Sequence, residues 1–371
     1  MTIKEVTTLI ETWAPLPYAE DFDNVGLLVG YPDTKVAGIL IAHDALENVV
    51  DEAINDNCNL IVCFHPIIFK GIKKFNGNNY VERVVIKAIK YDIAIYAIHT
   101  ALDNAFEGVN AAICNALGLE KRQILIPQKN TIKKLLTYVP VSKITEVRDA
   151  LFKVGAGGIG NYNECSFTVQ GIGTFNGNEY SNPTKGEKGT TQYEDEIQLG
   201  ITFHKHLQSV VIKTLLKVHP YEEVAYEITT LENTNQHIGM GMIGSLSNEL
   251  SEKDFLTHVK KSLPTGCIRH SDLLEKPISK VAVLGGSGSF AIANAKRAGA
   301  QAFITADLKY HDFYQAENDI LLVDVGHYES EQFTKTILAE HLTKKIANFA
   351  PALAEGNILI SKQNTNPVKY F

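Results

Sequence analysis

The chain has 371 residues, of which 45% are hydrophobic, and its formal net charge at pH 7 is -7. This length exceeds what one ordinary hydrophobic core accommodates, so two or more domains are expected. The negative charge, with no basic run, argues against electrostatic binding to nucleic acid or to acidic lipid, although a local basic pocket for a phosphorylated small molecule remains compatible with it.

The sequence contains no apolar run long enough to span a membrane. Its five cysteines are scattered and form no CxxC pair, which indicates neither a disulfide framework nor a thiolate zinc site. The segment 1–16 lacks the basic and apolar regions of a signal peptide, and the spacing of Ile3, Val6, Ile10 and Trp13 predicts an amphipathic helix. We therefore expect a cytoplasmic protein.

Strands alternate with helices in the first part of the chain. Short apolar runs predict strands at 36–42, 60–64 and 93–98, and helical periodicity predicts helices at 46–55 and 81–90. This alternation indicates a mainly parallel α/β layer.

A similar order recurs near the other end of the chain. The sequence predicts a strand at 280–284, a glycine-rich turn at 285–289, a helix at 290–298 and a strand at 302–305. We infer two related βαβ halves that bring their polar turns to one edge.

The segment 131–235 differs in character and contains a stretch rich in Gly, Asn, Ser and Thr. Its expected order is βαββαβ, which is the ferredoxin-like order. The expected elements are strands 135–141, 165–172, 197–203 and 224–228 and helices 143–154 and 207–218. We therefore predict a domain at 131–235 that is inserted between two core segments, 1–130 and 236–371.

The most informative stretch is 326–331, which follows the apolar run 320–325 and precedes a segment of helical periodicity. His327 and Glu331 are four residues apart, so they share one face if the helix begins early enough. An imidazole and a carboxylate beyond the end of a strand suit a borderline cation. The alternative is that Glu331 complements the helix dipole and His327 is an ordinary turn residue.

Other predicted strand ends carry similar donors. His65 follows the strand at 60–64, and His99 and Asp103 follow the next strand. Because the carboxyl ends of parallel strands point to one side of a sheet, these residues are expected to converge. His65, Asp103, His327 and Glu331 form a mixed imidazole and carboxylate set suited to Zn²⁺, Fe²⁺, Mn²⁺ or Ni²⁺, with one or two ions per chain.

Taken together, these motifs resemble the NIF3-like proteins, a family also called type 2 homologues of GTP cyclohydrolase 1. The resemblance covers about 1–130 and 236–371, and 131–235 resembles the PII-like or CutA-like domain of the longer bacterial members. The motifs that carry it are Asp23-Asn24-Val25-Gly26-Leu27, His65-Pro66, His99-Thr100 with Leu102-Asp103, Thr305 with Asp307, Gly326-His327-Tyr328 with Ser330-Glu331, and His219-Pro220-Tyr221-Glu222.

The resemblance implies a two-metal centre in a ring-shaped homohexamer, with His65, Asp103, His327 and Glu331 as ligands and Glu331 bridging. One position departs from the family pattern, because Phe64 stands where the first of two consecutive histidines is usual. A phenyl ring cannot ligate a metal. One ion is therefore expected to be weaker, partly water-ligated or absent.

Several further residues have two open interpretations. His99 either orients Asp103 or a metal, or caps its turn; Asp307 and His311 either assist the site or are an ordinary helix-terminal acid and a solvated imidazole. The pair His43-Asp44 is suggestive, although in the family only the acid recurs. Two weaker candidates are a phosphate-binding role for the loop 285–289 and a metal site at His204, His206 and His219.

Three functions are compatible with these observations. The first is a metal-dependent hydrolase acting on a nucleotide-like substrate, because paired ions lower the pKa of water and polarise the bond under attack. GTP ring opening comes from the family name alone. The second is a metal or ligand delivery protein, and the third is a regulatory scaffold without turnover.

Overall fold

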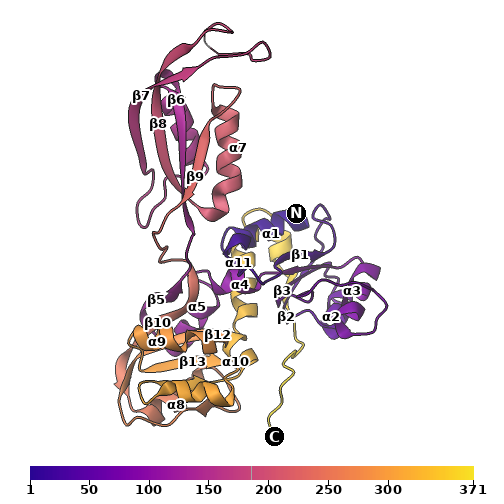
Figure 1. The fold of residues 1–371 in the computed structure, drawn as a ribbon. Helices are drawn as coiled ribbons and strands as arrows, with labels where there is room; N and C mark the ends of the chain where they lie inside the picture. The colour runs from indigo at the N-terminus through magenta and orange to yellow at the C-terminus, as the bar shows by residue number, and fades with distance from the viewer. Residues whose placement is uncertain (185) are drawn as a thin grey trace. The chain divides into compact units, whose positions relative to one another are not determined.

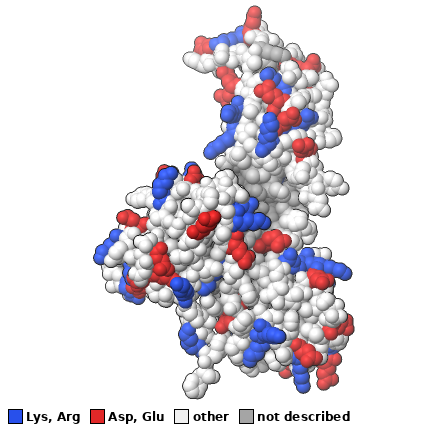
Figure 2. All heavy atoms as spheres, turned by 180° about the vertical axis from the view of Figure 1, so that it is seen from behind, with Lys and Arg blue, Asp and Glu red and all other residues white. Residues whose placement is uncertain are grey.

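The computed structural model describes residues 1–184 and 186–371, which form two compact units. Unit 1 combines Met1–Pro127 with His237–Phe371, and unit 2 is Gln128–Gln236 (Figure 1). Within the described residues, no helix has the length and apolar character needed to cross a membrane. On the face seen in Figure 2, acidic and basic side chains are interspersed.

The first sheet of unit 1 has five strands in the order β1-β4-β3-β2-β15. Strands β4, β3, β2 and β15 are parallel, and β1 runs antiparallel at one edge. Its apolar side chains pack on both faces, against α2 and α3 on one side and against α1 and α11 on the other. The bounds are α1 Ile3–Glu11, β1 Gly26–Val29, β2 Ile39–Asp44, α2 Glu47–Asn55, β3 Leu60–His65, α3 Tyr80–Lys90, β4 Ala94–Ala97, α11 Thr334–Ile346 and β15 Ile358–Ile360.

The second sheet has six strands in the order β11-β14-β13-β12-β10-β5. Its centre, β12-β13-β14, is parallel, whereas β10, β5 and β11 pair antiparallel. The fold is therefore mixed α/β rather than mainly parallel throughout. The bounds are β5 Glu120–Pro127, β10 Gly239–Leu250, β11 Arg269–His270, β12 Ile278–Ser287, β13 Ala302–Ala306 and β14 Leu321–Asp324.

One hydrophobic core joins the two sheets. It contains Leu60 and Tyr96 from the first sheet, Val283 and Val323 from the second, and side chains of the intervening helices. Each of the two sequence segments of unit 1 adds a strand to the sheet that the other mainly forms. Strand β5, from the first segment, lies at the edge of the second sheet, and β15, from the second segment, lies at the edge of the first. The connecting elements are η1 Leu16–Tyr18, α4 His99–Asp103, α5 Val109–Leu117, α8 Glu252–Ser262, η4 Ser289–Ala291, α9 Ile292–Arg297, η5 Tyr310–Ala316, α10 His327–Glu331 and α12 Pro351–Ala354.

Unit 2 is a four-stranded antiparallel sheet in the order β7-β8-β6-β9. The order along the chain is βαββαβ, with both helices packed on the sheet through their own apolar cluster. The bounds are β6 Ile132–Pro140, η2 Val141–Lys143, α6 Ile144–Lys153, β7 Ser166–Phe175, β8 Gln192–His204, η3 Lys205–Leu207, α7 Gln208–Val218 and β9 Tyr226–Thr230.

We expect a fragment spanning 128–236 to fold alone, because unit 2 has a separate core that includes Leu199 and Leu215. Its circular dichroism should show one cooperative thermal transition. Leu199→Ala should lower the free energy of unfolding by about 2–5 kcal/mol, since Leu199 is fully buried. An exposed control, Leu216→Ala, should change it little. A fragment without cooperative unfolding would contradict the prediction.

Candidate metal centre

His327 and Glu331 lie on one face of α10, directly after β14. The short helix α10 spans His327–Glu331 and precedes α11, so the two side chains face each other. Their closest atoms, His327 Nε2 and Glu331 Oε2, are 3.2 Å apart. Gly326 makes this turn possible, because it has a φ of +93° and a Cβ there would lie 2.3 Å from Glu329 Oε2.

His65 reaches the same carboxylate from the end of β3. Its Nε2 lies 3.2 Å from Glu331 Oε2, so His65, His327 and Glu331 form a group whose ligand atoms are all within 4.8 Å of one another. The sequence predicted that these residues converge, but not that they come from different sheets. The residues come from two different sheets whose strand ends face each other, and not from one sheet edge.

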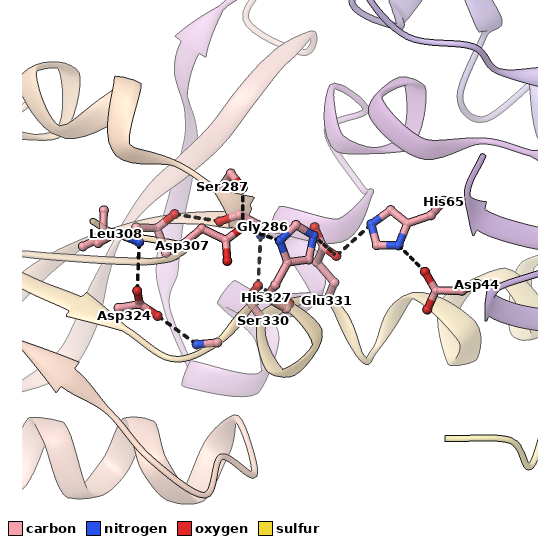
Figure 3. A network of polar contacts seen from close by, with 12 residues as sticks. Asp44, His65, Gly286, Ser287, Asp307, Leu308, Asp324, His327, Ser330 and Glu331 are labelled. Carbon is pink, nitrogen blue, oxygen red and sulfur yellow. Dashed lines mark hydrogen bonds and ion pairs between the residues drawn. The ribbon is translucent and has the colours of Figure 1, made fainter. Parts of the chain in front are cut away.

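Each of these imidazoles is oriented by a second carboxylate (Figure 3). His65 Nδ1 lies 2.8 Å from Asp44 Oδ1, and His327 Nδ1 lies 2.7 Å from Asp307 Oδ2. A carboxylate on Nδ1 fixes the ring and directs the opposite nitrogen, an arrangement common at metal-binding histidines. Asp307 thus adopts the assisting position that the sequence left open.

The imidazoles and carboxylates of the cluster stabilise one another's charged forms. Burial disfavours the imidazolium of His65, but Asp44 and Glu331 outweigh it and raise the His65 pKa to about 9. Burial likewise opposes the charge on His327, but Asp307 and Glu331 raise its pKa to about 11. Burial would raise the pKa of Glu331, yet the surrounding imidazoles hold it well below its usual range. The cluster therefore favours positive charge around the Glu331 carboxylate.

Asp103 ends α4 and lines a cavity of about 240 Å³ together with His327 and Glu331. Its Oδ1 is buried and has no hydrogen-bond partner among the described residues. Burial, followed by the negative charge of Glu331, raises the pKa of Asp103 well above its ordinary value. Asp103 thus faces the same cavity, but it lies outside the groups with ligand atoms within 4.8 Å of one another.

His99 is paired with Asp23 and not with Asp103. His99 Nδ1 lies 2.9 Å from Asp23 Oδ1, and Thr100 also donates to Asp23. Phe64 is fully buried among imidazoles, with its ring centroid 4.9 Å from that of His65 and 5.4 Å from that of His99. The phenyl ring therefore occupies a position from which a ligand could have reached the cluster.

The loop at 285–289 supports the carboxylate. Gly285 N donates to Asn110 Oδ1 and Gly286 N donates to Ser330 Oγ, so these two amides are engaged within the protein and do not favour a phosphate site. Gly286 has a φ of +68°, and a Cβ there would lie 2.4 Å from Glu331 Oε1. The glycine is needed for the close approach of Glu331.

Other histidines lie outside this cluster. His311 is exposed and contacts tyrosine rings, and His219 Nε2 bonds to the backbone oxygen of Tyr138. Across the described residues, the two groups with metal-ligand spacing are His65 with His327 and Glu331, and His43 with Asp44 and His65. The insert histidines form no such group within the described part of the chain.

His43 was not among the predicted metal ligands, although it lies beside them. Its side chain is 2% exposed, and His43 Nε2 lies 3.5 Å from Glu331 Oε2. The available signal was a histidine beside an aspartate at the end of a buried strand. The contact with Glu331 joins residues 288 positions apart, as the two residue numbers show, which no local pattern reveals.

The donor set fits a divalent cation. Imidazole nitrogens and carboxylate oxygens suit Zn²⁺, Fe²⁺, Mn²⁺ and Ni²⁺. Buried polar atoms normally have partners, yet His43 Nε2, Asp103 Oδ1 and Glu331 Oε2 make no hydrogen bond with the described residues. Unsatisfied nitrogen and oxygen atoms of this kind are the donors that divalent cations coordinate.

The fold and the histidine–carboxylate cluster define an α/β protein in which donors at the ends of strands meet between two sheets. The model of the Duf34/NIF3 (NGG1p interacting factor 3) family matches residues 1–367, and the chain belongs to this family. A Bacillus subtilis protein named GTP cyclohydrolase 1 type 2 homolog is 37% identical over 371 residues, covering 99% of this chain and 98% of its own. A Halalkalibacterium halodurans protein of the same name is 36% identical over 368 residues, covering 99% and 98%.

Solved structures show the same fold. A Bacillus cereus protein related to NIF3 superposes with a TM-score of 0.81 at 36% identity, and the match covers 100% of this chain and 99% of that one. A Staphylococcus aureus protein superposes with a TM-score of 0.75 at 29% identity and the same coverage. The family resemblance seen in the sequence is thus confirmed.

Proposed function

We propose that this protein is a metal-dependent hydrolase that acts on a nucleotide-like substrate. The observation that carries the proposal is the convergence of His65 Nε2 and His327 Nε2 on one oxygen of the buried Glu331 carboxylate. His65, Asp103, His327 and Glu331 would hold one or two divalent ions. When bound, such ions polarise a substrate oxygen and lower the pKa of water toward neutrality.

The protein's own residues would keep this centre in place. Asp44 and Asp307 fix the rings of His65 and His327, and Gly286 allows Glu331 to approach. Asp103 lines the cavity, and its Oδ1 has no hydrogen-bond partner among the described residues, so this oxygen is a candidate donor to the ion. The site would therefore need little rearrangement on loading.

The mouth of the cavity supports a heterocyclic substrate. Phe22 and Phe290 line it and are 64% and 57% exposed. Exposed aromatic rings stack on nucleobases with about 1–3 kcal/mol per base. The homologues named GTP cyclohydrolase 1 type 2 homolog suggest a guanine nucleotide as the first substrate to test.

The family likeness also suggests an assembly. We propose a homohexamer in which unit 2, with its ferredoxin-like strand order, serves as a PII-like or CutA-like domain. Light scattering of the full chain would give the number of copies.

The test combines metal content with turnover. Protein purified without chelators should retain one or two divalent ions per chain and hydrolyse at least one member of a nucleotide panel. Asp103→Asn should lower kcat by about 100-fold, because an amide replaces a carboxyl group that could bind the ion as a carboxylate. The exposed Asp272→Asn should leave both quantities unchanged. A wild-type protein without metal would contradict the proposal.

Delivery of a metal or ligand is the second candidate. The buried Phe64 ring favours it, because it supplies no ligand to the cluster and leaves an ion easier to release. Retained metal, no turnover and transfer of the ion to an apo-acceptor would support delivery.

A further inference from the structure

The imidazole of His43 is buried at the end of β2, and its polar contact with Glu331 is longer than a good hydrogen bond. It is 2% exposed, and neither ring nitrogen has a hydrogen-bond partner within the described residues. Leaving one buried polar atom unpaired costs about 1–3 kcal/mol. A histidine kept in this state indicates a partner that the protein itself does not provide.

His43 lies almost as close to Glu331 as the two ligand candidates do. Its Nε2 is 3.5 Å from Glu331 Oε2, compared with 3.2 Å for His65 Nε2 and 3.2 Å for His327 Nε2. In a tetrahedral zinc site with bonds of about 2.0–2.1 Å, neighbouring ligand atoms are about 3.3 Å apart. These three separations to one carboxylate oxygen are of that size, and His43 also belongs with Asp44 and His65 to a group whose ligand atoms all lie within 4.8 Å of one another.

The strand register explains how His43 relates to Phe64. Strands β2 and β3 are parallel neighbours, and Ala42 pairs with Cys63 while Asp44 pairs with His65. Residues 43 and 64 therefore occupy matching positions on the same face, and their ring centroids are 5.6 Å apart. A donor absent from β3 can thus be supplied by β2, one strand away.

We propose that His43 is a further metal ligand of this cluster, which binds through the Nε2 that lies beside Glu331. It supplies the imidazole that Phe64 cannot provide. The inference rests on the proposed metal function, because it assigns a further ligand to that centre. The ligand class is a divalent cation that accepts imidazole and carboxylate donors, such as zinc.

The test is a Co²⁺ titration of the metal-free full-length protein, followed by the visible absorption that tetrahedral Co²⁺ gives. His43→Phe removes the donor with little change in volume, and His43→Phe combined with Phe64→His moves the donor across the strand pair. We expect the single variant to bind Co²⁺ on the order of 100-fold more weakly and to lose the tetrahedral absorption. The double variant should regain a large part of the affinity.

Thermal unfolding of the metal-free proteins controls for folding. His43→Phe should still unfold cooperatively without metal, because it keeps the ring volume and breaks no hydrogen bond within the described residues. Unchanged Co²⁺ affinity and absorption in His43→Phe would overturn the assignment of His43 alone. A wild type that binds no Co²⁺ would instead overturn the proposed metal function, so the two failures are distinguishable.

Discussion

Replacing Glu331 by glutamine is expected to abolish metal retention. Glu331 Oε2 is the atom on which the Nε2 atoms of His43, His65 and His327 converge, within 3.2 to 3.5 Å. Glutamine keeps the shape but removes the negative charge, so any ion loses the anionic ligand on which the imidazoles converge. We expect affinity for Zn²⁺ to fall by at least about 100-fold. Elemental analysis and competition with a chromophoric chelator measure the change.

The matched control is Glu340→Gln on α11, which makes the same chemical change at an exposed carboxylate. It should retain the wild-type metal content. If Glu331→Gln holds as much Zn²⁺ as the control, the carboxylate is not a ligand and the centre must be assigned elsewhere.

Removing the metal is expected to destabilise unit 1. An ion that binds only the folded protein stabilises it by about 4 kcal/mol when its concentration is 1,000 times the dissociation constant. For a domain of this size, that loss corresponds to a decrease in Tm on the order of 10 °C. Differential scanning calorimetry before and after dialysis against a chelator provides the measurement.

Two controls make the calorimetry specific. The Glu331→Gln protein should show the same Tm with and without chelator, because it has no bound ion to lose. The transition of unit 2 should also stay in place, because its core is separate and the described part of it contains no group with metal-ligand spacing. A wild-type Tm that does not respond to the chelator would contradict a structural contribution from the ion.

Much of the fold follows from local patterns. The buried strands around 60–64 and 320–325 are nearly continuous apolar runs, and the periodicities of α2, α3 and α7 are regular. Other strands escape this reasoning. β10 begins with alternating glycine and methionine, of which glycine is depleted in strands, and β15 has only three residues. Both are strands because a neighbouring strand offers them a hydrogen-bonding edge.

The sequence by itself determined the family and the donors at two strand ends, because His65 and the pair His327 and Glu331 sit at the junctions between apolar runs and polar turns. These junctions are local features that a pattern of residues encodes.

Only the tertiary structure decided that these donors meet between two sheets, that Asp44 and Asp307 orient them, and that His43 joins them. The reason is physical. The contacts link segments far apart in the chain, and their geometry depends on how the shared core packs the two sheets against each other.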